Sequence, residues 1–111
     1  MDLQTQPEGN ILILSIAGKL DAVTTPQFEQ KIRELIDGGT QRILVDLDQL
    51  DYISSAGLRG LLLLSKLLKA KGGQAGVANI KGNVRSVFEM SAFATILPVS
   101  ESRAAGLARL Q

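Results

Sequence analysis

The sequence contains neither cysteine nor histidine among its 111 residues. Without cysteine, the chain cannot form a disulfide, a zinc–thiolate site or an iron–sulfur cluster. Without histidine, it lacks the most common general base and metal ligand of proteins, and with them the Ser–His–Asp arrangement. We therefore predict no catalytic residue, no metal site and no cofactor, and the sequence favours a protein that is not an enzyme.

Aromatic residues and net charge are also scarce. Aromatics make up 4% of the chain, so a core must consist mainly of Leu, Ile and Val. The balance of 12 basic and 11 acidic residues gives no electrostatic reason to expect a nucleic-acid partner. The longest apolar run in a helical segment covers residues 61–64, whereas crossing a bilayer takes about 20 residues. The sequence thus predicts a soluble, cytoplasmic protein without a membrane span, and its length predicts one domain over residues 1–111.

Short apolar runs alternate with segments of helical periodicity. The apolar runs predict a ragged edge strand near Leu3 and buried strands over residues 11–16, 42–47, 74–78 and 96–99. Helices are predicted from Thr24 to Gly38, over residues 58–71, from Asn83 through Phe88, and over about residues 100–110. Because parallel strands need crossover connections, we predict an α/β fold with a mixed, mostly parallel sheet, an antiparallel N-terminal edge and flanking helices.

Polar residues mark where the predicted helices begin. A threonine before Pro26 is expected to accept a hydrogen bond from a free N–H group of the first helix, and Asn83 is expected to cap the third. Gly38 and Gly39 are expected to end the first helix.

The most suggestive segment for function is residues 51–58 (DYISSAGL), between a predicted strand and a helix. Its two adjacent hydroxyls, Ser54 and Ser55, have no basic partner, so nucleophilic catalysis has no activator. One serine could simply cap the helix. Alternatively, one serine caps while the other is phosphorylated by another protein, because a helix N-terminus favours an anion.

The helix that follows has two unlike faces. Its core-facing arc is predicted to hold Leu58, Leu61, Leu62, Leu64, Ser65 and Leu68. The opposite side carries Arg59, Leu63, Lys66 and Ala70, with Leu67 at the margin. Either other elements cover Leu63 and Leu67, or these leucines belong to a docking surface rimmed by charge.

Three acidic residues support a weaker alternative. Asp46 and Asp48 share a face at strand spacing and Asp51 follows, which is compatible with a small Mg²⁺-dependent phosphotransfer enzyme. Acids at such positions more often end strands and cap turns.

Three segments in register resemble the STAS family of anti-anti-sigma factors, which are anti-sigma factor antagonists. The first is residues 18–26 (GKLDAVTTP), the second residues 45–58 (VDLDQLDYISSAGL), and the third residues 84–91 (VRSVFEMS) with 96–99 (ILPV). The resemblance covers about residues 10–100 and implies a partner-switching protein that regulates transcription.

In that family, the domain binds an anti-sigma factor that is also a serine kinase and thereby frees a sigma factor. The kinase brings its own ATP and Mg²⁺, phosphorylates a serine at the start of the second helix and so ends the association; a PP2C-type phosphatase reverses the mark. The acceptor, two residues before the motif glycine, falls on Ser55. Family members commonly carry Asp where this chain has Ser54, and Ser or Thr where it has Ala56.

We therefore predict that Ser55 is the phosphoacceptor. The partner-binding face is predicted to be bordered by Asp21, Ser54, Gly57, Arg59, Leu63 and Lys66. The alternative is a STAS adaptor or ligand-sensing module that is never phosphorylated. Apolar residues around Leu63 could also mediate self-association, so we expect a monomer or a weak dimer.

Overall fold

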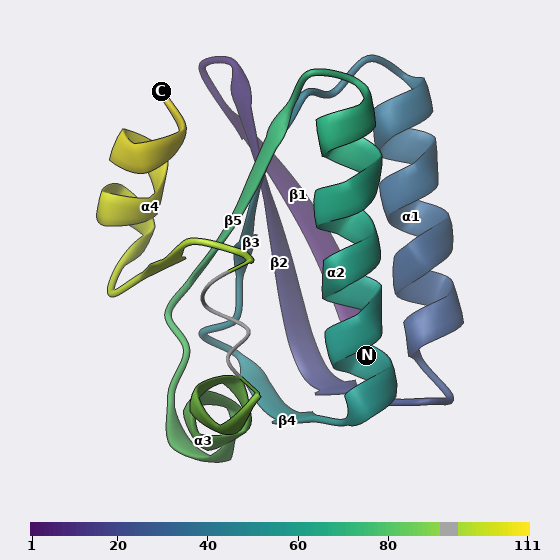
Figure 1. Cartoon of the computed structure of the whole chain (residues 1–111), viewed down its shortest axis with the longest axis vertical. Helices are drawn as coiled ribbons and strands as arrows, with labels where there is room; N and C mark the ends of the chain where they lie inside the picture. Colours follow the sequence, from purple (N-terminus) through teal and green to yellow (C-terminus); the bar gives the residue numbers. More distant parts are fainter. Residues whose placement is uncertain (92–95) are drawn as a thin grey trace.

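The apolar runs of the sequence form the centre of a mixed sheet. A computed structural model, which describes residues 1–91 and 96–111, contains strands β1 (Asp2–Glu8), β2 (Ile11–Leu20), β3 (Arg42–Asp46), β4 (Leu50–Ile53), β5 (Gln74–Ala78) and β6 (Val99–Ser100). The order across the sheet is β1-β2-β3-β5-β6 (Figure 1). β1 runs antiparallel to β2 and the other pairs are parallel, which confirms the predicted fold class.

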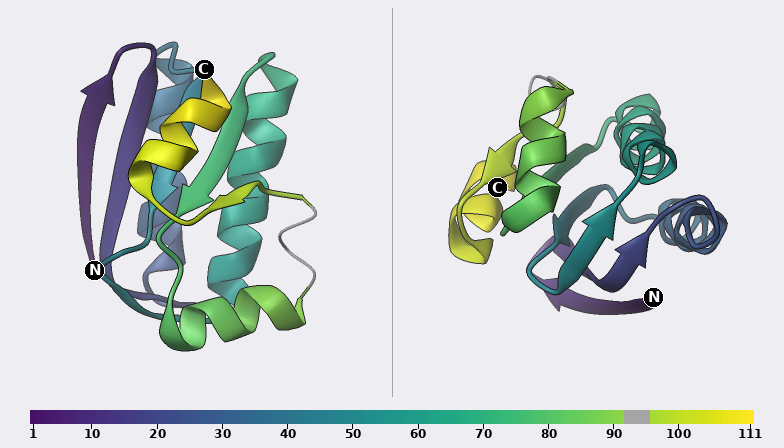
Figure 2. Two further views of the ribbon diagram at one scale, coloured as in Figure 1. Left: turned by 90° about the vertical axis from the view of Figure 1, so that its left-hand side faces the viewer. Right: turned by 90° about the horizontal axis from the view of Figure 1, so that it is seen from below.

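Helices lie on both faces of this sheet. They are α1 (Thr25–Asp37), α2 (Ser55–Ala70), α3 (Gly82–Met90) and α4 (Arg103–Leu110). α1 and α2 lie side by side on one face, α4 lies on the other over β3 and β5, and α3 lies near β4 (Figures 1 and 2). Among the described residues, no helix combines the length and the apolarity needed to cross a membrane.

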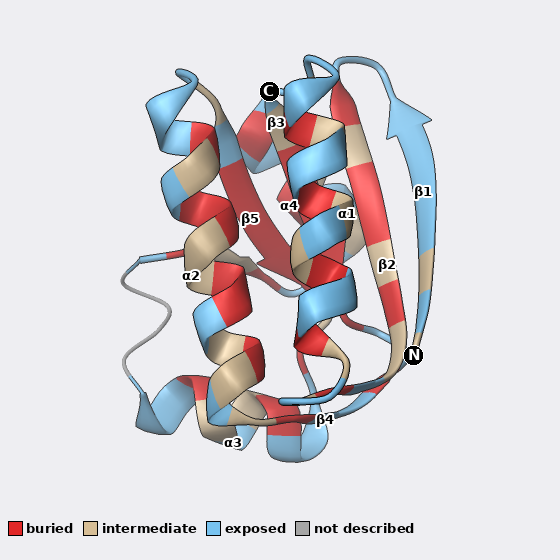
Figure 3. Cartoon of the chain, turned by 90° about the vertical axis from the view of Figure 1, so that its right-hand side faces the viewer, coloured by how far each residue is buried: buried red, intermediate tan, exposed pale blue. Residues whose placement is uncertain are grey.

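The core is divided between the two faces of the sheet. The larger cluster lies beneath α1 and α2, whose buried residues form stripes toward the sheet (Figure 3). The smaller cluster, beneath α4, contains Ile11, Leu44, Ala78 and Leu110. α4 approaches closely, because a Cβ atom on Gly106 would lie 2.7 Å from Cδ1 of Leu44.

β4 is a strand that the sequence pattern did not predict. It pairs in parallel with the end of β2, through Gly18, Lys19 and Leu20, and lies off the main path of the sheet. Asp51 and Tyr52 in its middle are exposed, so it contains no apolar run. This pairing places the start of α2 beside the end of β2.

Several predicted boundaries were wrong. α2 begins at Ser55, three residues before the expected start at Leu58. α3 begins at Gly82, so Asn83 lies inside the helix and does not cap it. The last strand covers Val99–Ser100, and the final helix begins only at Arg103, where the Ser102 hydroxyl accepts a hydrogen bond from the Ala105 N–H over 3.1 Å.

Candidate functional site

The two serines at the start of α2 have different roles. Ser54 occupies the N-cap position with an extended backbone (φ −101°, ψ 176°), and its Oγ accepts a hydrogen bond from the Gly57 N–H over 3.4 Å. The Ser54 N–H donates to the Leu20 carbonyl over 3.0 Å. The prediction that one serine caps the helix is therefore confirmed for Ser54.

Ser55 is the first residue of α2, and it is exposed. Among the described residues, none forms a hydrogen bond with its hydroxyl. N–H groups in the first turn of a helix have no intrahelical partner, and they create a positive potential around the helix start. The Ser55 hydroxyl is thus accessible at a position that favours a negative charge.

Gly57 fixes how closely α2 approaches β2. A Cβ atom at this position would lie 2.5 Å from the Leu20 carbonyl oxygen and 2.8 Å from Cγ1 of Ile53. Gly57 has no side chain and is buried, so it offers a partner no side-chain contact. We therefore expect Gly57 to contribute to the partner-binding face only through the position of the backbone.

Asp21 orders the loop between β2 and α1. Its Oδ1 accepts hydrogen bonds from the N–H groups of Val23 (3.0 Å) and Thr24 (3.1 Å). The bond from the Thr24 N–H is the largest cause that holds the pKa of the Asp21 carboxyl below its ordinary value; burial acts in the opposite direction. The carbonyl oxygen of Leu20, the residue before Asp21, accepts a hydrogen bond from the Ser54 N–H. The Asp21 loop therefore lies next to the start of α2.

The expected threonine cap of α1 is wrong. Thr24 is at the N-cap position, but its side chain makes no capping bond to the helix. Its Oγ1 instead accepts from the Asp21 N–H and donates to the Lys19 carbonyl, both over 2.9 Å. The threonine hydroxyl therefore stabilises the loop, in partnership with Asp21.

A stripe along the outer side of α2 extends from Ser55. Arg59 and Lys66 are exposed, and Leu62 between them is half-buried. Positions separated by four, seven and eleven residues lie on one side of a helix, so these residues follow one line from Ser55. Lys66 lies about 16 Å along the helix axis from Ser55, at 1.5 Å per residue.

The leucines of α2 differ in part from the prediction. Leu63 and Leu67 are half-buried and pack against the core, so other elements cover them partly. Leu62, which helical periodicity predicts on the core-facing arc, is half-buried as well. Its position at the edge of that arc was the only sequence signal that it could reach the surface.

The described residues do not neutralise the charge on this stripe. Among the ion pairs of the described residues, none includes Arg59 or Lys66. The site therefore combines an exposed hydroxyl, unpaired cations and half-buried leucines. Asp21 and Ser54 lie at one end, and Lys66 is the most distant of the predicted residues along the helix.

Comparison with known proteins identifies the family. The family model described as the STAS domain matches residues 2–106 of this chain. The chain belongs to the STAS domain family. A protein of Bordetella bronchiseptica that carries the provisional name anti-sigma factor antagonist BtrV is 39% identical to it over 108 residues, covering 97% of this chain and 93% of the relative.

Solved structures share the fold of this STAS domain. The crystal structure of a Thermotoga maritima protein, provisionally named an anti-sigma factor antagonist, superposes with a TM-score of 0.91 at 16% identity, covering 97% of this chain and 93% of that one. The phosphorylated form of SpoIIAA from Bacillus superposes with a TM-score of 0.75 at 20% identity, covering 99% and 100% of the two chains.

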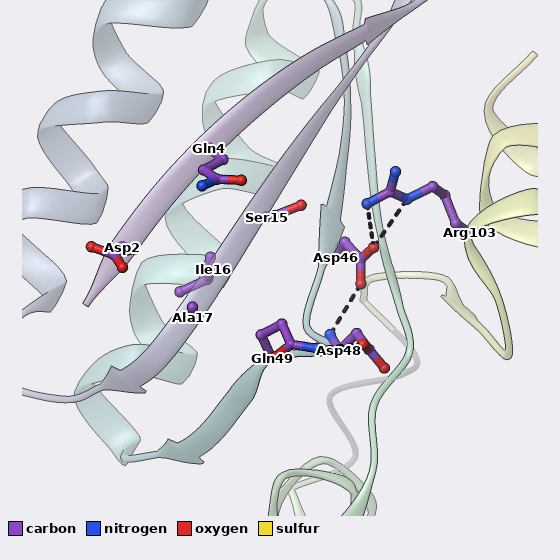
Figure 4. A pocket seen from close by; sticks show the side chains of 9 residues that line it. All are labelled: Asp2, Gln4, Ser15, Ile16, Ala17, Asp46, Asp48, Gln49 and Arg103. Carbon is purple, nitrogen blue, oxygen red and sulfur yellow. Dashed lines mark hydrogen bonds and ion pairs between the residues drawn. The ribbon is translucent and has the colours of Figure 1, made fainter.

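Asp46, at the end of β3, makes several contacts within this STAS domain. Asp46 is buried, and its Oδ2 accepts from Nη2 (2.9 Å) and Nε (3.1 Å) of Arg103 (Figure 4). Its Oδ1 accepts from the Asp48 N–H and from Nδ2 of Asn79, both over 3.0 Å. The described residues contain no group of three His, Cys, Asp or Glu side chains that could hold a metal ion. Asp46 thus connects α4 to the sheet.

Proposed function

We propose that this STAS domain is an anti-sigma factor antagonist whose partner, a serine kinase, phosphorylates Ser55 and is thereby released. One observation carries the proposal: Ser54 caps α2, while the neighbouring Ser55 hydroxyl is exposed and unbonded among the described residues. The names of the STAS relatives support the antagonist function, and the phosphorylated form known for SpoIIAA supports a switch of this kind.

A phosphate on Ser55 would be compatible with the fold. It adds a charge of about −1.5 to −2, close to the free N–H groups of the first turn and to Arg59 one turn along the helix. The added charge would therefore act mainly on the partner, since the helix itself accommodates it. We expect a loss of binding of about 1.5–3 kcal/mol, which is about tenfold to 150-fold in Kd.

The partner is expected to contact the outer stripe of α2 and the adjacent loop. The contacts come from Asp21, Ser54, Arg59, Leu63 and Lys66, with Gly57 shaping the backbone. The kinase supplies ATP and Mg²⁺, and a PP2C-type phosphatase restores the free hydroxyl. We expect this exchange to take place in the cytoplasm, to control transcription, and to involve a monomer or weak dimer of this chain.

The first experiment is intact-mass and phosphopeptide analysis after incubation with a candidate partner kinase, ATP and Mg²⁺. We expect a single phosphate on Ser55, its loss in Ser55→Ala, and its retention in the matched variant Ser54→Ala. A phosphate on Ser54 would contradict the assignment. Measurable binding without any phosphate would favour an adaptor or ligand-sensing module that is never phosphorylated.

The second experiment measures binding of the same partner by calorimetry. Ser55→Asp is expected to weaken binding by about tenfold or more, because its carboxylate carries part of the charge of a phosphate. The control Ser86→Asp adds the same charge at an exposed position of α3 and should bind as the unmodified protein does. Both variants should keep the Tm nearly unchanged; normal binding by Ser55→Asp would contradict the switch.

A further inference from the structure

A cavity lies away from the start of α2, between the second half of that helix, the edge of β5 and α4. Its volume is about 270 Å³. Its lining includes Ser65, Lys69, Ala75, Ile96, Arg109 and Leu110. Ser65 lies about 15 Å along the helix axis from Ser55, at 1.5 Å per residue. The cavity is therefore separate from the proposed phosphorylation site.

The wall formed by α2 contains an unpaired hydroxyl. Ser65 is only 4% exposed, and it lies among the leucines of the core-facing side. Among the described residues, no group forms a hydrogen bond with its hydroxyl. Its Oγ is not among the fully buried side-chain atoms without a partner, and Ser65 lines the cavity, so the hydroxyl reaches the cavity surface. The Ser65 hydroxyl is thus available to a ligand in the cavity.

The wall formed by β5 presents unpaired backbone groups. The Val77 N–H donates to the Pro98 carbonyl on the β6 side, whereas the Gln74 N–H donates to the Gln41 carbonyl on the β3 side, both over 2.9 Å. Because these directions alternate along a strand, the N–H and C=O of Ala75 point to the β6 side. Within the described part of the chain, β6 pairs with Val77 and Ala78 but not with Ala75, so the Ala75 groups lie at an open edge there.

The rim of the cavity is positively charged. Lys69 and Arg109 line it and are exposed, and none of the described lining residues is acidic. Among the ion pairs of the described residues, none includes either cation. Nη1 of Arg109 donates to the Val99 carbonyl over 2.8 Å, which holds the guanidinium at the rim. Ala75, Ile96 and Leu110 supply apolar surface below it.

We propose that this cavity binds a small organic anion, in which a carboxylate is joined to a short apolar chain. The carboxylate lies between Lys69 and Arg109, since unpaired cations on a partly apolar surface favour such a group. The chain packs against Ile96 and Leu110, and the Ser65 hydroxyl and the Ala75 N–H supply further donors. The proposal is independent of the proposed function, because no residue of the partner-binding face lines the cavity.

The test is an NMR titration of the ¹⁵N-labelled full chain with octanoate. We expect saturable shifts of the amide signals of Ser65, Ala75 and Leu110. The uncharged probe octanol should give no comparable saturation. The double variant Lys69→Gln/Arg109→Gln should weaken octanoate binding about tenfold or more. Ser65→Ala should also weaken it, but by less.

A second double variant controls for the lost charge. Arg33→Gln/Lys66→Gln removes the same net charge from exposed positions outside the cavity and should bind octanoate normally. Equal weakening in both double variants would overturn the proposal. Three other results would also overturn the proposal. They are no saturation up to about 10 mM octanoate, equal binding of octanol, and amide shifts caused by an acidic peptide but not by octanoate. If the cavity double variant does not fold, Lys69→Gln alone tests the charge, because its side chain is exposed.

Discussion

The carbonyl oxygen of Leu20 lies so close to Gly57 that a Cβ atom there would be only 2.5 Å away. The same oxygen accepts the Ser54 N–H over 3.0 Å. These contacts join the end of β2 to the first turn of α2. They fix the position of the Asp21 loop relative to the exposed Ser55, and so determine the shape of the proposed partner-binding face.

The close approach at Gly57 predicts a specific order of glycine variants. Gly57→Ala should lower the free energy of unfolding by about 1–3 kcal/mol, because the added methyl group meets backbone that cannot move freely. Gly60→Ala is the matched control in the same helix, where the methyl would meet side-chain atoms of Thr25 (3.0 Å) and Phe28 (3.3 Å). It gains the same helix propensity, about 0.5–1 kcal/mol, and should cost less. Urea unfolding measures both, and the reverse order would contradict this packing.

The two serines should differ in their effect on stability. Ser54→Ala removes the cap of α2 and should cost about 0.5–1 kcal/mol, at the lower end for a cap because the bond is long at 3.4 Å. Ser55→Ala should change stability by less than about 0.5 kcal/mol, since its exposed hydroxyl is unbonded. Chemical unfolding of both variants tests the assignment. A larger loss in Ser55→Ala would show that the roles are exchanged.

Asp21 predicts a dependence of stability on pH. The Thr24 N–H, above all, holds the pKa of its carboxyl below the ordinary value of 3.8 in the folded protein. A carboxyl with a lowered pKa stabilises the fold at pH values above its unfolded pKa, and this contribution is lost as the pH falls through the folded pKa. Asp21→Asn should therefore be less stable than the unmodified protein at neutral pH, and the difference should shrink below pH 3.8. Urea midpoints across this range provide the measurement; a constant difference would be the contrary result.

The ion pair of Asp46 and Arg103 predicts that substitutions of the two residues have coupled effects on the free energy of unfolding. Arg103→Gln leaves a carboxylate with 6% exposure without its cation, and should cost about 1–3 kcal/mol because the arginine side chain itself is 40% exposed. Adding Asp46→Asn should recover about 1 kcal/mol relative to the sum of the single changes. The exposed pair of Lys81 and Asp48 is the control, and Lys81→Gln should cost less than about 0.5 kcal/mol. Additive single changes in unfolding experiments would argue against the pair.

The elements that the sequence predicted well depend on local patterns. β5 covers residues 74–78 as expected, and the apolar run of β3 differs from its prediction by one residue. α1 follows the start and stop residues around Pro26 and Gly38. In each case the pattern of apolar residues and turn residues is contained in a short stretch of the chain, so neighbouring residues alone indicate the element.

The features that the sequence did not reveal depend on contacts between distant segments. β4 exists because the end of β2 pairs with it, although Asp51 and Tyr52 are exposed. Arg103, which binds Asp46, lies 57 positions away in the chain. The residues near Asp46 in the sequence therefore could not show whether its carboxylate binds an arginine or a metal ion.

The sequence indicated where the candidate site lies, but not its detailed geometry. Motif spacing led to Ser55, and the structure places it in an exposed position beside a capping Ser54. The burial of Gly57 and the partial exposure of Leu62 could not be derived from a helical wheel, because both depend on where β2, β4 and α1 lie around α2.

The pairing of β4 with the last residues of β2, away from the central ladder, also bears on the dynamics of the molecule. Hydrogen bonds in a short, peripheral pair can open while the central ladder of β2, β3 and β5 remains intact, because the two sets share only the chain of β2. Amide protons of β4 and of Ser54 would then exchange with solvent through a local fluctuation. Those of Leu14 and Val45 would exchange only through global unfolding. The segment that carries Ser55 could thus loosen toward another protein's active site at a fraction of the free energy that holds the domain together.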